Sequence, residues 1–425
     1  PQFLLHMALI LRHLYFPAIR RKKIPTETDK QIMQKTMKTA TAISQVDVKR
    51  CLVENIRSAS HAFKYDISRS QAYFNLLVGS GLLFSASGLS LGLTKRFLGY
   101  CRKSVSDKDP DVLLYLYKCA KLVHSYYIGN WKEKIDDKSI MEALNIGDFF
   151  FGTGQLLYLC YMAIELGDFN RSEAIIDQLH TIYEEYNFEH AESDVYILKA
   201  KLLMQRRDLF NALHYADKAI SQANKTSWIG RTVECLGTKS RGEILCQNLD
   251  AARKTITSAE EFIRQVGKEA IFIDWYRDYL MAKFFYDLSM LEDAMSRNMP
   301  VKIKKLKKAV SKSGKKCLAH TKKKAADERV ESFRLMGTYY WLIGNQKKAL
   351  ECWGKSAAEG ERLGARPDLS RTCFEIGRRL LEPNSKYREL NGITAEDYLA
   401  KARALFEEMD LQWDLDELDK IKASN

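Results

Sequence analysis

The amino-acid sequence predicts an all-α protein made of helical hairpins that stack in an array. The 425 residues include only seven prolines, and the chain is rich in helix-favouring Ala, Leu, Lys and Glu, with few β-branched runs. Apolar residues recur at the three-to-four-residue spacing of a buried helix face along most of the sequence. Short turns that combine Gly with Asn or Asp separate these segments, because Gly ends one helix and Asn or Asp caps the next.

The clearest hairpin covers residues 333–357. Its first helix places small Gly337 beside larger apolar residues, Gly344 and Asn345 form the turn, and its second helix carries Trp353. Small residues let two helices approach, and one large aromatic fills the remaining space. This order matches the tetratricopeptide pattern, which repeats every 34 residues or so. Such a hairpin is stable only when neighbouring hairpins cover its apolar faces, so we predict a right-handed superhelix of tetratricopeptide-like repeats.

Other segments repeat the pattern with less regularity. The second-best hairpin covers residues 193–223 and turns at Arg207 and Asp208; weaker ones cover residues 111–148, 156–186 and 226–266. An irregular loop is expected over residues 382–394 and a short cap at the C-terminus. We expect four segments: an N-terminal amphipathic helix and basic link (1–26), a helical repeat array (27–300), a Lys-rich helical segment (301–325), and C-terminal repeats with a cap (326–425).

Cysteine and histidine usage argues against a metal site or a cofactor. The nine cysteines are scattered without a CxxC pair, and the eight histidines form no HExxH pattern. This distribution is typical of buried thiols in a reducing cytoplasm. Residues 88–92 fit the GxSxG pattern of a nucleophilic serine, but no strand precedes them, so a turn or packing role for Ser90 is favoured over catalysis.

The N-terminal stretch is apolar but is interrupted by His6, Arg12 and His13. Its uncharged run is too short to span a bilayer. We therefore expect no transmembrane segment and an amphipathic helix that ends near Pro17. The chain starts within a helix and without an initiator Met, which indicates a fragment of a longer protein.

A Lys-rich segment covers residues 302–324 and contains no acidic residue. Ile303, Leu306 and Val310 give it part of an apolar face, which predicts a basic amphipathic helix with a candidate break at residues 311–314. The favoured interpretation is a solvated outer face. The alternative is a patch for an acidic partner or nucleic acid, although the segment lacks the aromatic and Arg residues that read bases. Its lysines are Lys302, Lys304, Lys305, Lys307, Lys308, Lys312, Lys315, Lys316, Lys322, Lys323 and Lys324.

The turns GNW, IGD, LGD and GNQ, the segment WLIGNQKKALECWGKSAAEGERLG, and the ending FEIGRRLL…YLAKARALFEEMDLQWDLDEL together resemble one known type of region. They are similar to the C-terminal tetratricopeptide-like repeats of large multidomain signalling ATPases of the STAND type, some of which are fused to class III adenylyl cyclase or protein kinase domains. The resemblance implies a sensor or scaffold that controls an ATPase module. The chain has no GxxxxGK[ST], kinase or cyclase motif, so any catalytic domain is expected upstream of Pro1.

We therefore expect a non-catalytic scaffold that binds a protein or peptide in the groove of the superhelix and regulates a signalling ATPase. The alternative is a nucleic-acid-associated repeat protein that uses residues 302–324. In repeat arrays the first helix of each hairpin lines the groove. The partner-binding candidates on those helices are Arg334, Thr338 and Trp341 in the clearest hairpin, and Ile197, Lys201 and Gln205 in the second-best.

Overall fold

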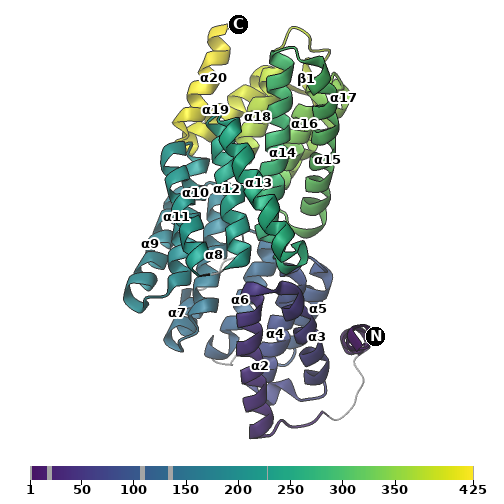
Figure 1. The fold of residues 1–425 in the computed structure, drawn as a ribbon, viewed down its shortest axis with the longest axis vertical. Helices are drawn as coiled ribbons and strands as arrows, with labels where there is room; N and C mark the ends of the chain where they lie inside the picture. Colours follow the sequence, from purple (N-terminus) through teal and green to yellow (C-terminus); the bar gives the residue numbers. More distant parts are fainter. Residues whose placement is uncertain (1, 17–21, 106–110, 133–136, 227, 425) are drawn as a thin grey trace.

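The structure is a computed structural model that describes residues 2–16, 22–105, 111–132, 137–226 and 228–424. These residues form twenty α-helices, two short 3-10 helices and one two-stranded sheet. The chain runs from an N-terminal group of helices at one end of an elongated molecule to the C-terminal helices at the other (Figure 1). The predicted all-α array of stacked helical hairpins is confirmed.

The first five helices form a bundle with its own apolar core. They are α1 (Gln2–Tyr15), α2 (Glu27–Val46), α3 (Val48–Ala62), α4 (Gln71–Ala86) and α5 (Leu91–Arg102), with the 3-10 helix η1 (Ile67–Arg69) before α4. Helix α2 begins with a capping box in which Thr26 and Asp29 satisfy each other's backbone amides. Phe63, Tyr73 and Phe97 are at most 1% exposed and occupy the centre of this bundle.

The rest of the chain forms hairpins of paired helices. The pairs are α6 (Asp111–Ile128) with α7 (Asp137–Asn145), α8 (Phe149–Leu166) with α9 (Phe169–Tyr186), α10 (Glu189–Gln205) with α11 (Leu209–Lys225), α12 (Ile229–Leu245) with α13 (Leu249–Val266), α14 (Ile273–Ser296) with α15 (Pro300–Lys324), α16 (Arg329–Leu342) with α17 (Gln346–Leu363), and α18 (Arg366–Leu380) with α19 (Ala395–Glu408). The 3-10 helix η2 (Lys268–Ala270) precedes α14, and α20 (Gln412–Ser424) closes the array.

The turn chemistry agrees with the predicted pattern. The side chains of Asp168, Asp208, Asn248 and Asn345 each accept a hydrogen bond from a backbone amide in the first turn of the following helix. Each of these residues follows a residue with positive φ that ends the preceding helix. The sequence therefore encodes the hairpin spacing through its turns as well as through its apolar faces.

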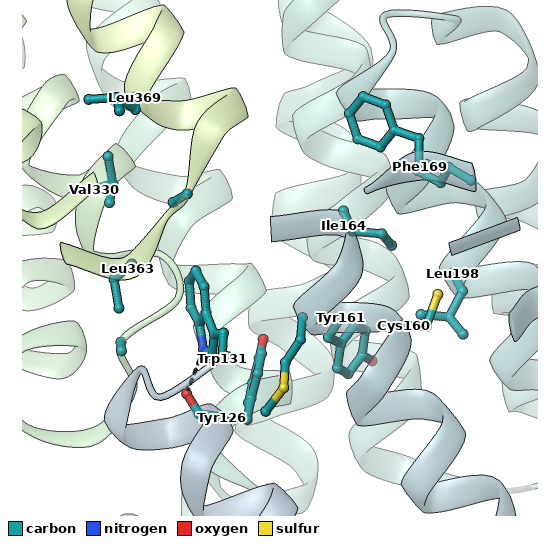
Figure 2. Packing of buried hydrophobic residues seen from close by; sticks show 14 of the residues in the cluster. Tyr126, Trp131, Cys160, Tyr161, Ile164, Phe169, Leu198, Val330, Leu363 and Leu369 are labelled. Carbon is teal, nitrogen blue, oxygen red and sulfur yellow. Dashed lines mark hydrogen bonds between the residues drawn. The ribbon is translucent and has the colours of Figure 1, made fainter. Parts of the chain in front are cut away.

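The array curls until its early and late helices touch. The Arg366 guanidinium, at the start of α18, donates to the carbonyls of Leu166 and Gly167 at the end of α8, at 2.7 and 3.1 Å. Figure 2 shows the shared core, where Trp131 and Tyr126 lie near Leu363, which comes from the far end of the sequence. The inner side of the superhelix is consequently closed in around a small interior space.

Two local expectations are corrected. Residues 311–314 do not break the Lys-rich helix, because α15 is continuous and Gly314 gives the Phe284 ring room to pack; a Cβ there would lie 2.8 Å from the ring. The loop over residues 382–394 contains a hairpin of β1 (Glu389–Leu390) and β2 (Ile393–Thr394). Asn391 and Gly392 both have positive φ, as a tight two-residue hairpin turn requires.

Among the described helices, α8 alone is long and apolar enough to cross a membrane. Most of it is buried between neighbouring helices, where Leu156, Cys160 and Ile164 are at most 3% exposed. Packing within the array accounts for its composition.

Candidate functional site

The inner helices surround a polar space that we call the inner cavity. Its volume is about 130 Å³. Lining residues come from α6, α8, α10, α12, α14, α16 and α18, which are the first helices of their hairpins. Charged side chains of both signs dominate the lining: Glu165, Lys201, Arg207, Arg241, Arg277, Asp278, Glu328, Glu331, Arg334, Asp368 and Arg371.

Three of the six predicted partner-binding residues meet at the inner cavity. The Lys201 ammonium lies 2.8 Å from Asp278 Oδ1 and 3.1 Å from Glu234 Oε1. Arg334 donates to Glu331 Oε1 at 2.9 Å. The Gln205 carbonyl accepts from Arg371 at 2.6 Å, and the Gln205 side chain accepts from the same guanidinium. These three residues come from two hairpins that are far apart in the sequence.

The structure places the other three candidates within the packing between helices. Ile197 is fully buried in the core around α8 and α10. Thr338 donates to Glu375 Oε1 at 2.9 Å, and Trp341 Nε1 donates to Glu382 Oε2 at 2.8 Å. Both side chains are 5% exposed. These hydrogen bonds join α16 to α18 and to the segment that follows α18.

Most of the charged lining residues were not among the predicted partner-binding residues, and Arg207 stands out among them. It follows α10 with a φ of 63° and points into the inner cavity. Its side chain forms no ion pair within the described part of the chain, and its Nε is buried without a hydrogen-bond partner there. Burial and the nearby Arg371 and Arg334 lower the pKa of Arg207 to about 9. Asp414 and Glu331 offset part of this effect, and the Trp413 ring centroid lies 5.4 Å from the guanidinium carbon. Among the described residues, Arg207 is therefore the arginine of the lining that has no ion pair of its own. The sequence predicted a turn at Arg207 and Asp208, but it did not assign the Arg207 side chain to the groove.

Two acidic residues of the lining, Glu328 and Glu165, have raised pKa values. Burial, with help from Glu331, raises the pKa of Glu328 to about 8 despite the salt bridge to Arg241 at 2.6 Å. Burial and the neighbouring Asp368 raise the pKa of Glu165 well above its ordinary value. Arg241 and Arg334 instead lower the pKa of Glu331 to about 2. Near neutral pH, Arg241 is therefore balanced mainly by Glu331 and less by Glu328.

A buried ionic cluster supports the wall of the inner cavity. Arg231 is fully buried and pairs with both Asp194 and Glu234. The Tyr161 hydroxyl donates to Glu234 at 2.7 Å. Burial raises the pKa of Asp194 to about 7. This cluster ties α8, α10 and α12 together behind the lining residues.

The Lys-rich segment lies apart from the inner cavity, as the second helix of its hairpin. Within α15, Val310 and Cys317 are buried against α14 and α16, whereas most of the lysines are exposed. The exposed set is Lys302, Lys304, Lys305, Lys308, Lys312, Lys315, Lys316 and Lys322; Lys307 and Lys324 are half-buried, and the side chain of Lys323 lies outside the described residues. A basic outer face therefore exists, with Tyr339 beside Lys307.

Ser90 has a structural role where the structure describes it. Its hydroxyl caps α5 by accepting from the Leu93 amide at 3.1 Å. In the described residues no group of three or more His, Cys, Asp or Glu side chains is placed to hold a metal ion.

Comparison with known proteins bears on the fold. No family model matches the sequence. No curated protein matches it either. The structure is similar to the crystal structure of a Rap protein complexed with Competence and Sporulation Factor, with a TM-score of 0.57 over 92% of this chain and 99% of that chain, at 11% sequence identity. It also matches the structure of phAimR, with a TM-score of 0.33 over 88% of this chain and 99% of that chain, at 12% identity. The likeness to the Rap protein shows a shared fold.

Proposed function

We propose that this chain is a non-catalytic regulatory region that binds a peptide through the inner cavity, with a carboxylate of the peptide against Arg207. The observation that carries the proposal is the guanidinium of Arg207, which forms no ion pair with the described residues and lines a partly closed space. Desolvating a cation without a counter-charge costs free energy, and an incoming carboxylate would remove that cost while forming a bidentate pair. The similar Rap structure was solved as a complex with a factor, which supports a ligand-binding role for the fold.

The size of the inner cavity limits how a peptide could enter. A volume of about 130 Å³ accommodates one carboxylate-bearing end and not a whole peptide. Lys201, Gln205 and Arg334 flank the same space and would contact that end. For more of the peptide to enter, α8 would have to separate from α18, and the hydrogen bonds from Arg366 to Leu166 and Gly167 are the contacts that such an opening breaks.

The proposed partner rests on the sequence resemblance, and the proposed location rests on cysteine usage. We propose that peptide binding controls a nucleotide-binding ATPase module in the same polypeptide and that the protein works in the cytoplasm. Nine free cysteines, seven of them buried, support a reducing location. In the full polypeptide, a bound peptide should change the rate of ATP hydrolysis, and Arg207→Met should abolish that response.

The direct test screens a random short-peptide library for binding, then compares each hit as a free carboxylate and as a C-terminal amide. For hits that bind through their C-terminus, we expect Arg207→Met to weaken binding by roughly tenfold or more, as for the loss of a buried charged hydrogen bond. The matched control is Arg206→Met, because Arg206 is adjacent in sequence but pairs with Glu173 at the partly exposed surface. The proposal would be refuted if the hits bound Arg207→Met, Arg206→Met and the unaltered chain with equal affinity, and if amidation of the peptides did not change that affinity.

A further inference from the structure

A second space, which we call the bundle cavity, lies where the N-terminal bundle meets the repeat array. Its volume is about 160 Å³. Helices α2, α3 and α4 line one side, and α6, α8, α10 and the starts of α12 and α14 line the other. The bundle cavity shares no lining residue with the inner cavity. In Figure 1 this junction lies where α2 and α4 approach α6 and α8.

Most of the bundle cavity is apolar, and one part of its wall is aromatic. Leu76, Leu83, Val123 and Leu157 are typical of the apolar lining. The aromatic part consists of Phe150, Phe151, His190, Trp228, Phe272 and Trp275. An engineered apolar cavity of roughly 150 Å³ binds benzene. The bundle cavity is therefore large enough for one aromatic ring.

The aromatic wall also presents polar atoms that the protein leaves unsatisfied. Trp228 Nε1, His190 Nε2 and Asp274 Oδ1 are buried and have no hydrogen-bond partner among the described residues. Trp228 and Asp274 are 5% and 4% exposed. The His190 and Trp228 rings lie 4.7 Å apart, and Trp228 meets Trp275, the neighbour of Asp274, edge-on at 5.7 Å. Buried polar atoms in native proteins nearly always have hydrogen-bond partners. These three atoms are therefore candidates for hydrogen bonds to a bound molecule.

The surroundings favour an uncharged partner. The other oxygen of Asp274 accepts from the Tyr158 hydroxyl at 2.9 Å, and burial raises the pKa of Asp274. Burial, followed by the nearby Arg231, lowers the pKa of His190. Both shifts favour neutral side chains on this wall. Asp194, which also lines the cavity, is paired with Arg231, so a charged ligand would lose its hydration without gaining a free counter-ion.

We propose that the bundle cavity is a binding site for a small uncharged molecule consisting of one aromatic ring that carries a hydroxyl group. The ring fills the apolar space. The hydroxyl oxygen accepts a hydrogen bond from Trp228 Nε1 or from Oδ1 of neutral Asp274, and the hydroxyl donates one to His190 Nε2. Because the bundle and the array both line the cavity, the bound molecule holds them together. The site is independent of the peptide site, and either can exist without the other.

The first test compares phenol with toluene, which has nearly the same shape but no hydroxyl, by calorimetric titration of the unaltered chain. Toluene leaves water more readily, so a purely apolar cavity binds toluene more tightly. The proposed hydrogen bonds reverse that order, and we expect phenol to bind roughly tenfold more tightly than toluene. No binding of either probe, as for a cavity that holds only water, or tighter binding of toluene, would overturn the proposal.

The second test locates the site with glycine variants. Gly79 in α4 and Gly154 in α8 both line the bundle cavity, and a Cβ at either position meets nothing within 4 Å. Gly79→Leu or Gly154→Leu should fill the space and weaken phenol binding by about tenfold or more, since a close-packed interior has no other room for the ring. The matched control is Gly99→Leu in α5. A Cβ at Gly99 also meets nothing within 4 Å, and Gly99 does not line the bundle cavity. If all variants bound phenol with equal affinity, phenol would bind outside the bundle cavity, and the proposed site would be refuted.

A third variant separates the hydrogen bond from the shape of the site. Trp228→Phe keeps an aromatic ring but removes the indole N–H. We expect phenol to lose most of its preference over toluene while toluene binding changes little. The indole N–H resonance that disappears in this variant should be the one that shifts when phenol is added to the unaltered chain. An unchanged preference, in a variant that melts cooperatively, would contradict the assigned contact.

Discussion

Gly337 of α16 lies against the indole ring of Trp353 in α17, so closely that any Cβ at residue 337 would overlap the ring. Trp353 is fully buried, and its Nε1 donates to the Arg334 carbonyl at 3.0 Å. The ring therefore cannot move away without losing a buried hydrogen bond. This contact fixes the spacing of the two helices in the clearest hairpin, as the small-next-to-large sequence pattern predicted.

Gly337→Ala should therefore destabilise the protein, although alanine is the better helix former. We expect a loss of about 1–3 kcal/mol from overpacking, measured as a lower urea midpoint with an unchanged slope. Gly99→Ala is the control, because a Cβ there meets nothing within 4 Å and the change should stabilise α5 slightly. Equal midpoints for Gly337→Ala and the unaltered chain would show that the indole can shift at little cost.

Arg231→Met should be strongly destabilising, because it leaves Asp194 and Glu234 buried without their shared cation. Removing one member of such a buried group costs about 3–5 kcal/mol. Arg206→Met, which breaks a partly exposed pair with Glu173, should cost less than about 1 kcal/mol. Thermal unfolding of both variants measures the contrast, and similar melting temperatures would argue against the buried cluster.

His320 should make the stability depend on pH. Burial, then the nearby Lys324, lowers the pKa of His320 to about 4 from an ordinary 6.5, and its Nε2 lies 3.1 Å from the Ile273 carbonyl. Between these values the unfolded chain binds a proton that the folded chain does not, so stability is lost as the pH falls from 6.5 towards 4. We expect His320→Gln to reduce this loss in urea unfolding at a series of pH values. The exposed His214→Gln is the control, and matching pH profiles for all three proteins would exclude this role.

The exposed lysines of α15 should be dispensable for folding and for peptide binding. Replacing Lys304, Lys305, Lys308 and Lys312 with Gln removes charge from an exposed face, so stability should change by no more than about 0.5 kcal/mol. The same variant tests the alternative function. If the unaltered chain retains RNA or DNA with a steep salt dependence and the variant does not, α15 is a nucleic-acid site.

Much of the fold could be predicted from local patterns. The turns at Gly344 and Asn345 and at Arg207 and Asp208, together with small residues such as Gly337 and Ala216, gave the hairpins, because turn chemistry and helix periodicity act over a few residues. The Lys-rich helix was predicted too, but a break was expected at residues 311–314. Gly314 is instead part of the continuous helix, where it makes room for the Phe284 ring of the neighbouring helix, and this contact is visible only in the tertiary structure. Asn391 and Gly392 are typical of a two-residue hairpin turn, but the irregular loop predicted over residues 382–394 included no strands.

The candidate sites depended on tertiary structure. Periodicity placed Lys201, Gln205 and Arg334 on inner helices, but it equally suggested Ile197, Thr338 and Trp341, which pack between helices. The closure of α8 against α18 decides which side chains reach the inner cavity, and it arises from contacts such as that of Arg366 with Leu166, two hundred residues apart. The sequence by itself determined the helices and their stacking, which depend on near neighbours. Only the tertiary structure decided which distant charges and rings meet, because superhelix curvature sums small packing angles over many hairpins.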